Sequence, residues 1–400
     1  MMNLIKFTGL ALLLFLLCQD VSRCHQYHVT VMPSAYAPCF KQPCFTLGQF
    51  AERVTEYSGS NSSVKLSLMP GNHTLASELI ISNVLEFSMI SASDTKVWIL
   101  CEDATILSIV SVFSVSIGNL ALLGCEGIKL TSVANFYVEE CMFLSFNGNI
   151  AILEFNRSTV TITKSSFMAS DNNISVYTSH PNNESDALNT MVISNTSNVS
   201  IHASTFTTKQ GRALYAEESI INIRSVAFCN STIPLLNKDL TLIKLLNTTI
   251  EFKDVAIMNN ERHMIVFTKD SRVTISGSRI SHNIGTFYTI KSNISIYNTT
   301  ISENDGRFSV ICLVKTYANI TDGNFSNNTG SFLVRNSNVR FYRSYLFANC
   351  VQRESMMKVK HLQTEGTLTS IQSTVDFYGT VTFQENYSEK SGGGYPCFWK

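Results

Sequence analysis

The chain has 400 residues, of which 44% are hydrophobic and 15% are charged. A charged fraction this far below the roughly 25% of an average soluble domain argues against a disordered chain and predicts extensive buried surface. The 30 basic and 30 acidic residues cancel, so bulk charge would not attract nucleic acid, an anionic membrane surface or a polyanionic polysaccharide. Nucleic acid is therefore excluded as an expected partner.

The first 24 residues, 1–24, have the layout of a secretory signal peptide. Lys6 precedes an apolar run from Phe7 to Leu17, and polar residues follow it. This run is shorter than the about 20 apolar residues of a membrane-spanning helix. A second apolar stretch, at 104–124, alternates with serine and threonine and is predicted to form buried strands. We therefore expect an extracellular protein, secreted or at the cell surface, without a transmembrane segment in the mature chain.

Residues 25–63 are predicted to form an N-terminal cap that contains a short helix. Thr46 and Gln49 have the spacing of a capping box, in which each side chain bonds the other residue's backbone N–H. Four apolar residues fall on one face of this helix: Leu47, Phe50, Val54 and Tyr57. The helix is expected to cover the apolar end of whatever follows it.

A unit of about 22 residues recurs through most of the remaining chain. Each copy has two β-branched or other apolar residues separated by one position, and another apolar residue five positions later, as in STVTITKSSF, SNVSIHASTF and SNISIYNTTI. The copies have the following anchor positions, the last with a one-residue shift: Val115, Phe136, Val160, Val199, Ile221, Ile250, Val273, Ile294, Ala318, Val339 and Val375.

The period of two and the many β-branched residues are typical of strands and exclude helical repeats. A unit of this size cannot close a hydrophobic core alone, so the copies must stack on their neighbours. The sequence therefore predicts an all-β parallel solenoid of about 11 coils, which spans residues 64–390 and is followed by a tail at 391–400.

Asparagine recurs three residues after the last apolar position of the C-terminal units. When stacked at the strand spacing of about 4.8 Å, such amides can hydrogen-bond from coil to coil. We predict an inward-facing structural ladder, and a polar binding strip is the alternative. The ladder residues are Asn260, Asn283, Asn304, Asn328, Asn349 and Asn386.

The chain resembles a right-handed parallel β-helix of the pectin-lyase-like type over roughly residues 64–390. LSLMPGNHTL at 66–75 is similar to the strand, Pro-Gly turn and strand with which such helices begin. VTFQENYSEKSGGG at 381–394 resembles the repeat of polymorphic outer-membrane proteins, F-x-x-N followed by paired glycines, which uncharacterised extracellular β-helix proteins of invertebrates share.

The 11 cysteines are consistent with an oxidising compartment. Cys39 and Cys44, in PCFKQPCF, are predicted to form a local disulfide. Cys101 and Cys125 lie 24 residues apart, about one coil, and are a second candidate pair. The sequence has no C-x-x-C motif, and no metal or other cofactor is expected.

Sequons of the type Asn-x-Ser/Thr are dense enough to predict passage through a glycosylating compartment. Chance matches in an Asn-, Ser- and Thr-rich chain are the alternative reading for some of them. The sequons lie at Asn61, Asn72, Asn156, Asn173, Asn183, Asn195, Asn198, Asn230, Asn247, Asn293, Asn298, Asn319, Asn324, Asn327 and Asn386.

The catalytic patterns of pectin-active enzymes are missing. An isolated Asn-x-Asp stands at Asn237 to Asp239, but the Asp-Asp, Gly-His-Gly and Arg-x-Lys that accompany it in polygalacturonase-like hydrolases do not occur, nor does the Arg-x-Pro-x-x-Arg of pectate lyases. Adjacent carboxylates point to opposite faces of a strand, so they are not facing catalytic pairs. These pairs are Glu102 and Asp103, Glu139 and Glu140, and Glu217 and Glu218; His202, His263 and His282 lack metal-ligand spacing.

Two longer units, at 176–189 and 351–366, are expected to leave the solenoid as loops. We interpret the chain as a glycoprotein scaffold for adhesion or recognition without catalysis, with glycans or extracellular proteins as partners. A polysaccharide lyase or glycoside hydrolase with carboxylates from separate coils is the competing class. A third alternative is the N-terminal piece of a larger β-helix receptor. Three or more carboxylates within about 10 Å on one groove free of glycan sites would favour the enzyme.

Overall fold

The computed structural model describes residues 25–33, 44–101, 106–124, 127–145, 153–169, 189–195, 197–209, 211–232, 241–347, 349–351, 368–384 and 386–388. The predicted signal peptide at 1–24 and the tail at 391–400 lie outside these residues.

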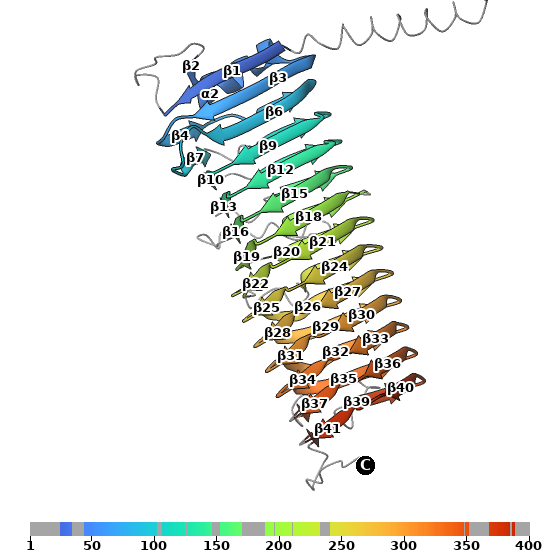
Figure 1. Cartoon of the computed structure of the whole chain (residues 1–400). Helices are drawn as coiled ribbons and strands as arrows, with labels where there is room; N and C mark the ends of the chain where they lie inside the picture. The colour runs from blue at the N-terminus through green and yellow to red at the C-terminus, as the bar shows by residue number, and fades with distance from the viewer. Residues whose placement is uncertain are drawn as a thin grey trace, which may run out of the picture.

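Three parallel β-sheets, here called A, B and C, enclose one apolar core (Figure 1). In each coil the chain passes through a strand of sheet A, then one of sheet B, then one of sheet C, so neighbours within a sheet come from successive coils.

Sheet A has 15 strands. In spatial order they are β2 (Cys44–Thr46), β1 (His25–Met32), β3 (Gly59–Leu68), β6 (Val84–Ser91), β9 (Ser114–Gly118), β12 (Asn135–Glu139), β15 (Thr159–Thr163), β18 (Asn198–His202), β21 (Ile220–Arg224), β24 (Thr249–Lys253), β27 (Arg272–Ser276), β30 (Asn293–Tyr297), β33 (Tyr317–Thr321), β36 (Asn338–Tyr342) and β40 (Thr374–Tyr378).

Sheet B has 13 strands. They are β4 (Asn72–Leu75), β7 (Val97–Cys101), β10 (Leu120–Leu123), β13 (Met142–Ser145), β16 (Ser166–Ala169), β19 (Thr205–Thr208), β22 (Ala227–Cys229), β25 (Ala256–Met258), β28 (Arg279–Ser281), β31 (Thr300–Ser302), β34 (Asn324–Ser326), β37 (Tyr345–Phe347) and β41 (Thr382–Gln384).

Sheet C has 14 strands, and β39 (Leu368–Ile371) pairs with β35 beside the main path. The others are β5 (Leu79–Ser82), β8 (Ile106–Val110), β11 (Gly127–Thr131), β14 (Leu153–Asn156), β17 (Asn189–Ser194), β20 (Arg212–Glu217), β23 (Thr241–Leu246), β26 (Glu261–Lys269), β29 (Ile284–Ile290), β32 (Asp305–Val314), β35 (Thr329–Arg335), β38 (Cys350–Val351) and β42 (Tyr387–Ser388).

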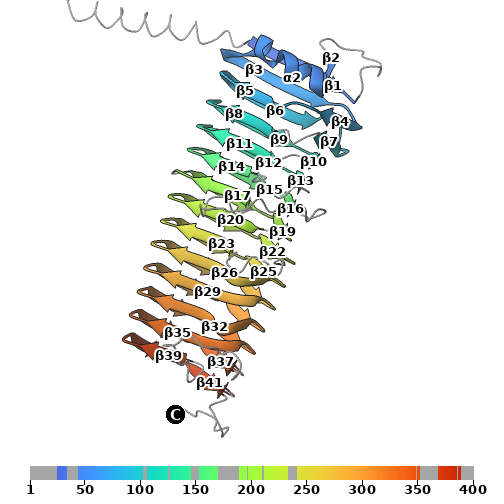
Figure 2. The same ribbon diagram turned by 180° about the vertical axis from the view of Figure 1, so that it is seen from behind.

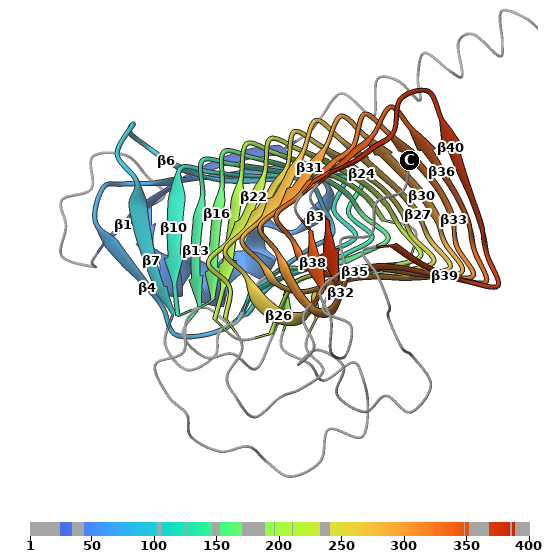
Figure 3. The same ribbon diagram turned by 90° about the horizontal axis from the view of Figure 1, so that it is seen from below.

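The coil is right-handed, as predicted. Sheet A strands run from right to left across the front of Figure 1, and sheet C strands return across the back, which Figure 2 shows. The chain therefore turns clockwise as it recedes from the N-terminal end, which is the usual hand of parallel strand connections. Figure 3, seen from below, shows the coils stacked along one axis.

The predicted repeat is confirmed by the register of sheet A. All eleven anchors lie in its strands, and each pairs directly with the next, from Val115 with Phe136 to Val339 with Val375. The long intervals of the pattern coincide with the segments 170–188, 233–240 and 352–367, which are added between strands without disturbing the pairing.

Sheet A begins earlier than the repeat pattern indicates. β1, β3 and β6 bury Val29, Leu66 and Met89 in the row that Ile117 continues, two residues after the Val115 anchor. These strands use Leu, Phe and Met where later copies use Val and Ile, so the pattern search does not detect them. Residues 25–63, predicted as a cap, thus contribute strands as well as a helix.

The predicted capping helix is α2 (Leu47–Arg53), which continues into the 3₁₀ turn η1 (Val54–Tyr57). The capping box is present: the Gln49 backbone N–H donates to Thr46 Oγ1 at 3.2 Å, and the Thr46 N–H donates to Gln49 Oε1 at 3.0 Å. Leu47 and Phe50 are buried against the first coils, so the helix covers the N-terminal end of the core.

We expect Thr46→Ala to lower the free energy of unfolding by about 1 kcal/mol, the usual contribution of an N-cap side chain. Urea denaturation followed by circular dichroism measures this change. Thr55→Ala, at an exposed position in η1, is the matched control and should change the free energy of unfolding by less than about 0.5 kcal/mol. Equal losses of unfolding free energy in the two variants would show that the capping box does not stabilise the N-terminal helix.

From β24 to β38 every corner between strands has two residues. In the coil of β30, β31 and β32 the first corner residues are Lys291, Asn298 and Glu303, with φ of 49°, 44° and 57°. Left-handed backbone is unfavourable for such side chains, but each backbone N–H donates to a carbonyl of the next coil at 2.9 to 3.0 Å. Inter-coil bonding therefore holds this conformation even where no Asn or Gly stands.

Candidate functional site

The corners on both sides of sheet A have one to three residues from β9 to β40, so no long described segment flanks this part of its outer face. The breaks in the described chain at 102–105, 125–126, 146–152, 170–188 and 233–240 all join a strand of sheet B to one of sheet C. The predicted loop at 176–189 belongs to this set, and the loop at 351–366 joins β38 to β39 within sheet C. These segments therefore adjoin sheet C along the chain, whereas 34–43 joins β1 to β2 within sheet A. The strand residues on the outer face of sheet A are mostly polar.

Carboxylates on the outer face of sheet A are far apart. Glu86, Glu139, Glu251 and Asp376 stand on β6, β12, β24 and β40. Successive members are separated by two, four and five strands, or about 10, 19 and 24 Å at the usual strand spacing. Glu86 accepts a hydrogen bond from Ser63 of the preceding coil, and Glu139 binds Lys164 of the following coil. The nearest two carboxylates therefore point apart and do not form the pair, about 5 to 9.5 Å apart, that glycoside hydrolysis requires.

The adjacent carboxylates of the sequence do not form facing pairs where they are described. Glu139 and Glu140 both bind Lys164, at 3.4 and 2.9 Å, and the hydrogen bond from Lys164 holds the pKa of Glu140 below its usual range. Glu217 accepts a hydrogen bond from the Tyr215 hydroxyl at 2.9 Å, and Glu218 is a corner residue. Glu102, Asp103 and the Asn237 to Asp239 motif lie outside the described residues.

A group of three carboxylates lies at the corner between sheets B and C. Glu261 of β26 and Asp305 of β32 both pair with Ile284 of β29, which lies between them. Their backbones are therefore two strand spacings, about 10 Å, apart. Glu303, two residues before Asp305, forms an ion pair with His282 at 2.8 Å. The sequon residue Asn327 follows at the same corner one coil later, so this group is not free of glycan sites.

The predicted histidines are dispersed. His202 ends β18 in sheet A, His263 lies in β26 of sheet C, and His282 occupies the corner described above. Within the described ranges, no group of three or more His, Cys, Asp or Glu side chains could hold a metal ion.

The six predicted ladder asparagines form one continuous hydrogen-bonded column at the corner between sheets B and C. Asn304 is typical: its Oδ1 accepts from the backbone N–H and Nδ2 of Asn283 at 3.1 and 2.9 Å. Its own Nδ2 donates to Asn328 Oδ1 at 3.0 Å and to the Ile280 carbonyl at 2.9 Å. Equivalent bonds join all six residues, Asn260, Asn283, Asn304, Asn328, Asn349 and Asn386. The geometry is that of an internal structural column, with no amide face turned to solvent over most of its length.

Two further columns, which the sequence reasoning missed, occupy the other corners. Between sheets C and A, the Ser271 backbone N–H donates to Ser292 Oγ, and Thr248 N–H to Ser271 Oγ, at 3.2 and 3.1 Å. Between sheets A and B, Ser165 N–H donates to Ser204 Oγ at 3.2 Å. The sequence signal is a Ser or Thr directly before many strands of sheet A and, less regularly, two residues after them, but such residues are too common in this chain to stand out.

Of the described sequons, Asn386 has an internal role. Its Nδ2 donates to the Leu346 carbonyl at 2.8 Å and its Oδ1 accepts from Asn349, so a glycan on Nδ2 and the column exclude each other. Asn156 and Asn319 are half-buried, and Asn173 and Asn183 lie outside the described residues. The exposed sequon residues are Asn61, Asn72, Asn195, Asn198, Asn230, Asn247, Asn293, Asn298, Asn324 and Asn327.

Neither predicted disulfide is observed as a pair, because Cys39 and Cys125 lie outside the described residues. The register between β7 and β10 pairs Leu100 with Leu123. Cys101 follows Leu100 by one residue, and Cys125 follows Leu123 by two. The disulfide between Cys101 and Cys125 stays a prediction. Cys44 begins β2. The free thiols of the described chain include Cys141 and Cys312, whose burial raises the pKa to about 11 and about 12, so both are protonated and unreactive.

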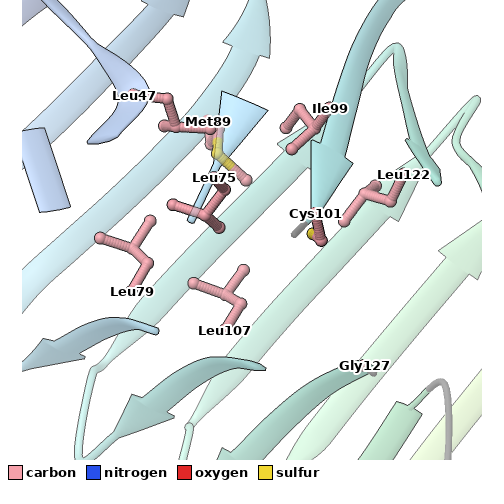
Figure 4. A pocket seen from close by; sticks show the side chains of 9 residues that line it. All are labelled: Leu47, Leu75, Leu79, Met89, Ile99, Cys101, Leu107, Leu122 and Gly127. Atoms are coloured by element: carbon pink, nitrogen blue, oxygen red, sulfur yellow. The ribbon is translucent and has the colours of Figure 1, made fainter. Parts of the chain in front are cut away.

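The core holds a small apolar cavity of about 10 Å³ near the N-terminal end (Figure 4). Leu75, Leu107 and Leu122 are among the side chains that surround it, and Cys101 lies at its edge. A cavity of this volume holds at most one water, and apolar walls offer water no partners. It is a packing defect between coils, too small for any ligand.

A polar hollow of about 340 Å³ lies at the edge between sheets C and A. Corner residues and the first residues of the sheet A strands line it over four coils, from β24 to β33. Its charged lining consists of Asp270, Arg272, Lys291 and Lys315, and Asn247, Asn293 and Tyr317 complete the rim. The sequence reasoning missed this site, because its residues come from separate repeat units.

The described part of the chain contains no helix that is long and apolar enough to cross a membrane.

No protein-family model matches the chain, and no curated protein matches it in sequence. Among solved structures, an alginate lyase, AlyF-OU02, in complex with G6 aligns over 92% of this chain and 91% of its own, with 9% identity and a TM-score of 0.43. PfbA, a surface adhesin of Streptococcus pneumoniae, aligns over 88% and 91%, with 10% identity and a TM-score of 0.34. The A-module of the mannuronan C-5 epimerase AlgE6 of Azotobacter vinelandii aligns over 84% and 93%, with 10% identity and a TM-score of 0.38.

Structural similarity at these identities and TM-scores does not indicate a function. The similar structures include both adhesins and polysaccharide lyases. The class follows from the strand order itself: the protein is a right-handed parallel β-helix, as predicted.

Proposed function

We propose that this chain is a secreted or cell-surface glycoprotein whose β-helix is a non-catalytic scaffold for adhesion or recognition, with glycans or extracellular proteins as partners. The observation that carries the proposal is the outer face of sheet A, which is mostly polar and, from β9 to β40, has no long flanking segment in the described chain. Its nearest two carboxylates point apart, so they do not act together on one glycosidic bond.

The signal-peptide pattern and the exposed sequons support the extracellular part of the proposal. Ten sequon asparagines are exposed on the described surface, and several of them, such as Asn195, Asn230 and Asn298, stand at corners with positive φ. Such exposed corner side chains are accessible to a glycosylating enzyme, and a glycan on Asn195 would replace the hydrogen bond from its Nδ2 to Asn156 Oδ1 at 3.2 Å.

The proposal is tested with the full chain purified from the medium of secreting cells. We expect it to bind one or more members of a panel of polysaccharides and extracellular matrix proteins, and to release neither reducing sugar nor unsaturated product from any polysaccharide it binds. Treatment with an endoglycosidase should lower its apparent mass, and an unchanged mass would contradict the glycoprotein part.

The hydrolase or lyase alternative rests on the group at the corner between sheets B and C. If a polysaccharide is cleaved, the cleavage should be lost in Glu303→Gln and Asp305→Asn, because these two residues stand at one corner, two coils after Glu261. Glu251→Gln, on the isolated carboxylate of sheet A, is the matched control. Product release that depends on Glu303 or Asp305 would replace the scaffold proposal by an enzyme.

A further inference from the structure

Although the net charge of the chain is zero, positive charge is concentrated on one edge of the β-helix. Lys291 and Lys315 occupy equivalent positions at the corner between sheets C and A in successive coils. The Lys291 backbone N–H donates to the Val314 carbonyl at 2.9 Å, so the backbones of the two lysines lie about one strand spacing, about 4.8 Å, apart. Lys269 and Arg335 end β26 and β35, one residue before this corner in the coils on either side.

The hollow described above lies along this edge, and its cations have no carboxylate of their own. Arg272, Lys291 and Lys315 line it, and none of them takes part in an ion pair of the described residues. Asp270 is the one carboxylate in the lining. Three cations against one anion therefore face solvent across a polar surface whose further walls include the hydroxyls of Thr249 and Ser292.

The far end of the hollow is held in place by its neighbours. Arg340 lies over the ring of Tyr317, with 5.4 Å from the guanidinium carbon to the ring centroid, and approaches Asp376 at 3.9 Å. Tyr317 starts β33 directly after the Lys315 corner. This contact places an aromatic ring on the rim beside two exposed lysines, Lys291 and Lys315.

From this geometry we propose that the edge between sheets C and A binds a polyanionic glycan laid along the helix axis, through its sulfate or carboxylate groups. Lys and Arg side chains form strong charge-assisted hydrogen bonds to such oxyanions, and a chain along the axis meets a cation at each coil. This inference rests on the proposed recognition function and names the ligand class and the surface.

Binding at this edge requires that a sequon in the hollow carry no glycan. Asn247 and Asn293 line the same hollow, and a glycan on Asn293 would stand between Arg272 and Tyr317, its neighbours in sheet A. The binding form of the protein must therefore leave Asn293 unmodified. Peptide mapping that finds Asn293 fully glycosylated in the secreted protein would overturn the proposal.

The direct test measures binding of the secreted full chain to three immobilised probes: a sulfated heparin-type oligosaccharide, polygalacturonate and uncharged dextran. We expect binding to a charged probe, weakening as salt rises, and none to dextran. Comparison of the first two probes distinguishes a sulfated glycan from a carboxylated one. Lys291→Gln combined with Lys315→Gln should weaken binding at least about tenfold, because two charge-assisted contacts are lost.

The control is Lys65→Gln combined with Lys253→Gln, which removes two exposed positive charges from other parts of sheet A. It should change the affinity less than about twofold, since exposed charges beyond a Debye length of about 10 Å are screened. Equal losses in the two double variants would show that only bulk charge attracts the probe. If neither charged probe binds at low salt while a protein or a neutral glycan does, the proposed polyanion site is wrong and the recognition function stands. If a bound probe is cleaved and product is released, the non-catalytic recognition function is wrong instead.

Discussion

Asn304→Ala is expected to lower the free energy of unfolding by about 3 kcal/mol, since it removes several buried hydrogen bonds worth about 1 kcal/mol each and leaves buried groups unpaired. The Asn304 side chain is 3% exposed. Truncation deprives the Asn283 backbone N–H of its acceptor and the Ile280 carbonyl of a donor. Neither group can reach water through the surrounding coils.

Two comparison variants make this expectation specific. Asn222→Ala, on the outer face of sheet A, should change the free energy of unfolding by less than about 0.5 kcal/mol. Asn304→Ser should have an intermediate effect, because Ser231 occupies the same column: its Oγ accepts from the Thr208 N–H, and its own N–H donates to Asn260, both at 3.1 Å.

Urea denaturation gives the free energies, and hydrogen exchange locates the opening, since stacked repeats can unfold locally rather than in one step. We expect faster exchange at the backbone amides of Asn283 and its neighbouring coils in Asn304→Ala. A loss below about 0.5 kcal/mol, or exchange that is unchanged near Asn283, would mean that water replaces the side chain and that the column contributes little to stability.

The sequence predicts the coil well because the same inward positions recur in every unit. Val160, Val199 and Ile221 are separated by unequal intervals, yet they pair directly, since the extra residues enter at corners or between strands. Period-two alternation depends only on which side chains face the core, and insertions outside the strands do not alter it.

The properties of the outer surface were harder to predict because they depend on register across coils. Lys291 and Lys315 are 24 residues apart, and in the sequence each is an ordinary polar residue before a strand. The two become neighbours only when the coils stack, and Asp270 and Arg272 join them from a third coil. Net charge averages over the chain and therefore cannot reveal an edge of one sign.

Phe206→Ala should have the largest effect of a single core substitution, lowering the free energy of unfolding by about 4 kcal/mol. Its ring is fully buried and stacks between Phe167, at 4.8 Å and 13°, and Phe228, at 5.0 Å and 17°. Removing a buried phenylalanine ring costs about 3 to 5 kcal/mol, and each lost aromatic pair adds about 0.5 to 1.5 kcal/mol at most.

Phe206→Leu separates the loss of volume from the loss of stacking. The same inward row of sheet B carries Ile257, Ile280 and Leu346 in later coils, so an aliphatic side chain fits the row and the expected loss is only about 1.5 kcal/mol. Urea denaturation of the two variants gives the comparison. If Phe206→Leu were as damaging as Phe206→Ala, the stability of these coils would depend on the stacked rings themselves. Losses below about 1 kcal/mol in both variants would instead show that neighbouring coils close over the cavity, which the two-residue corners and their inter-coil hydrogen bonds oppose.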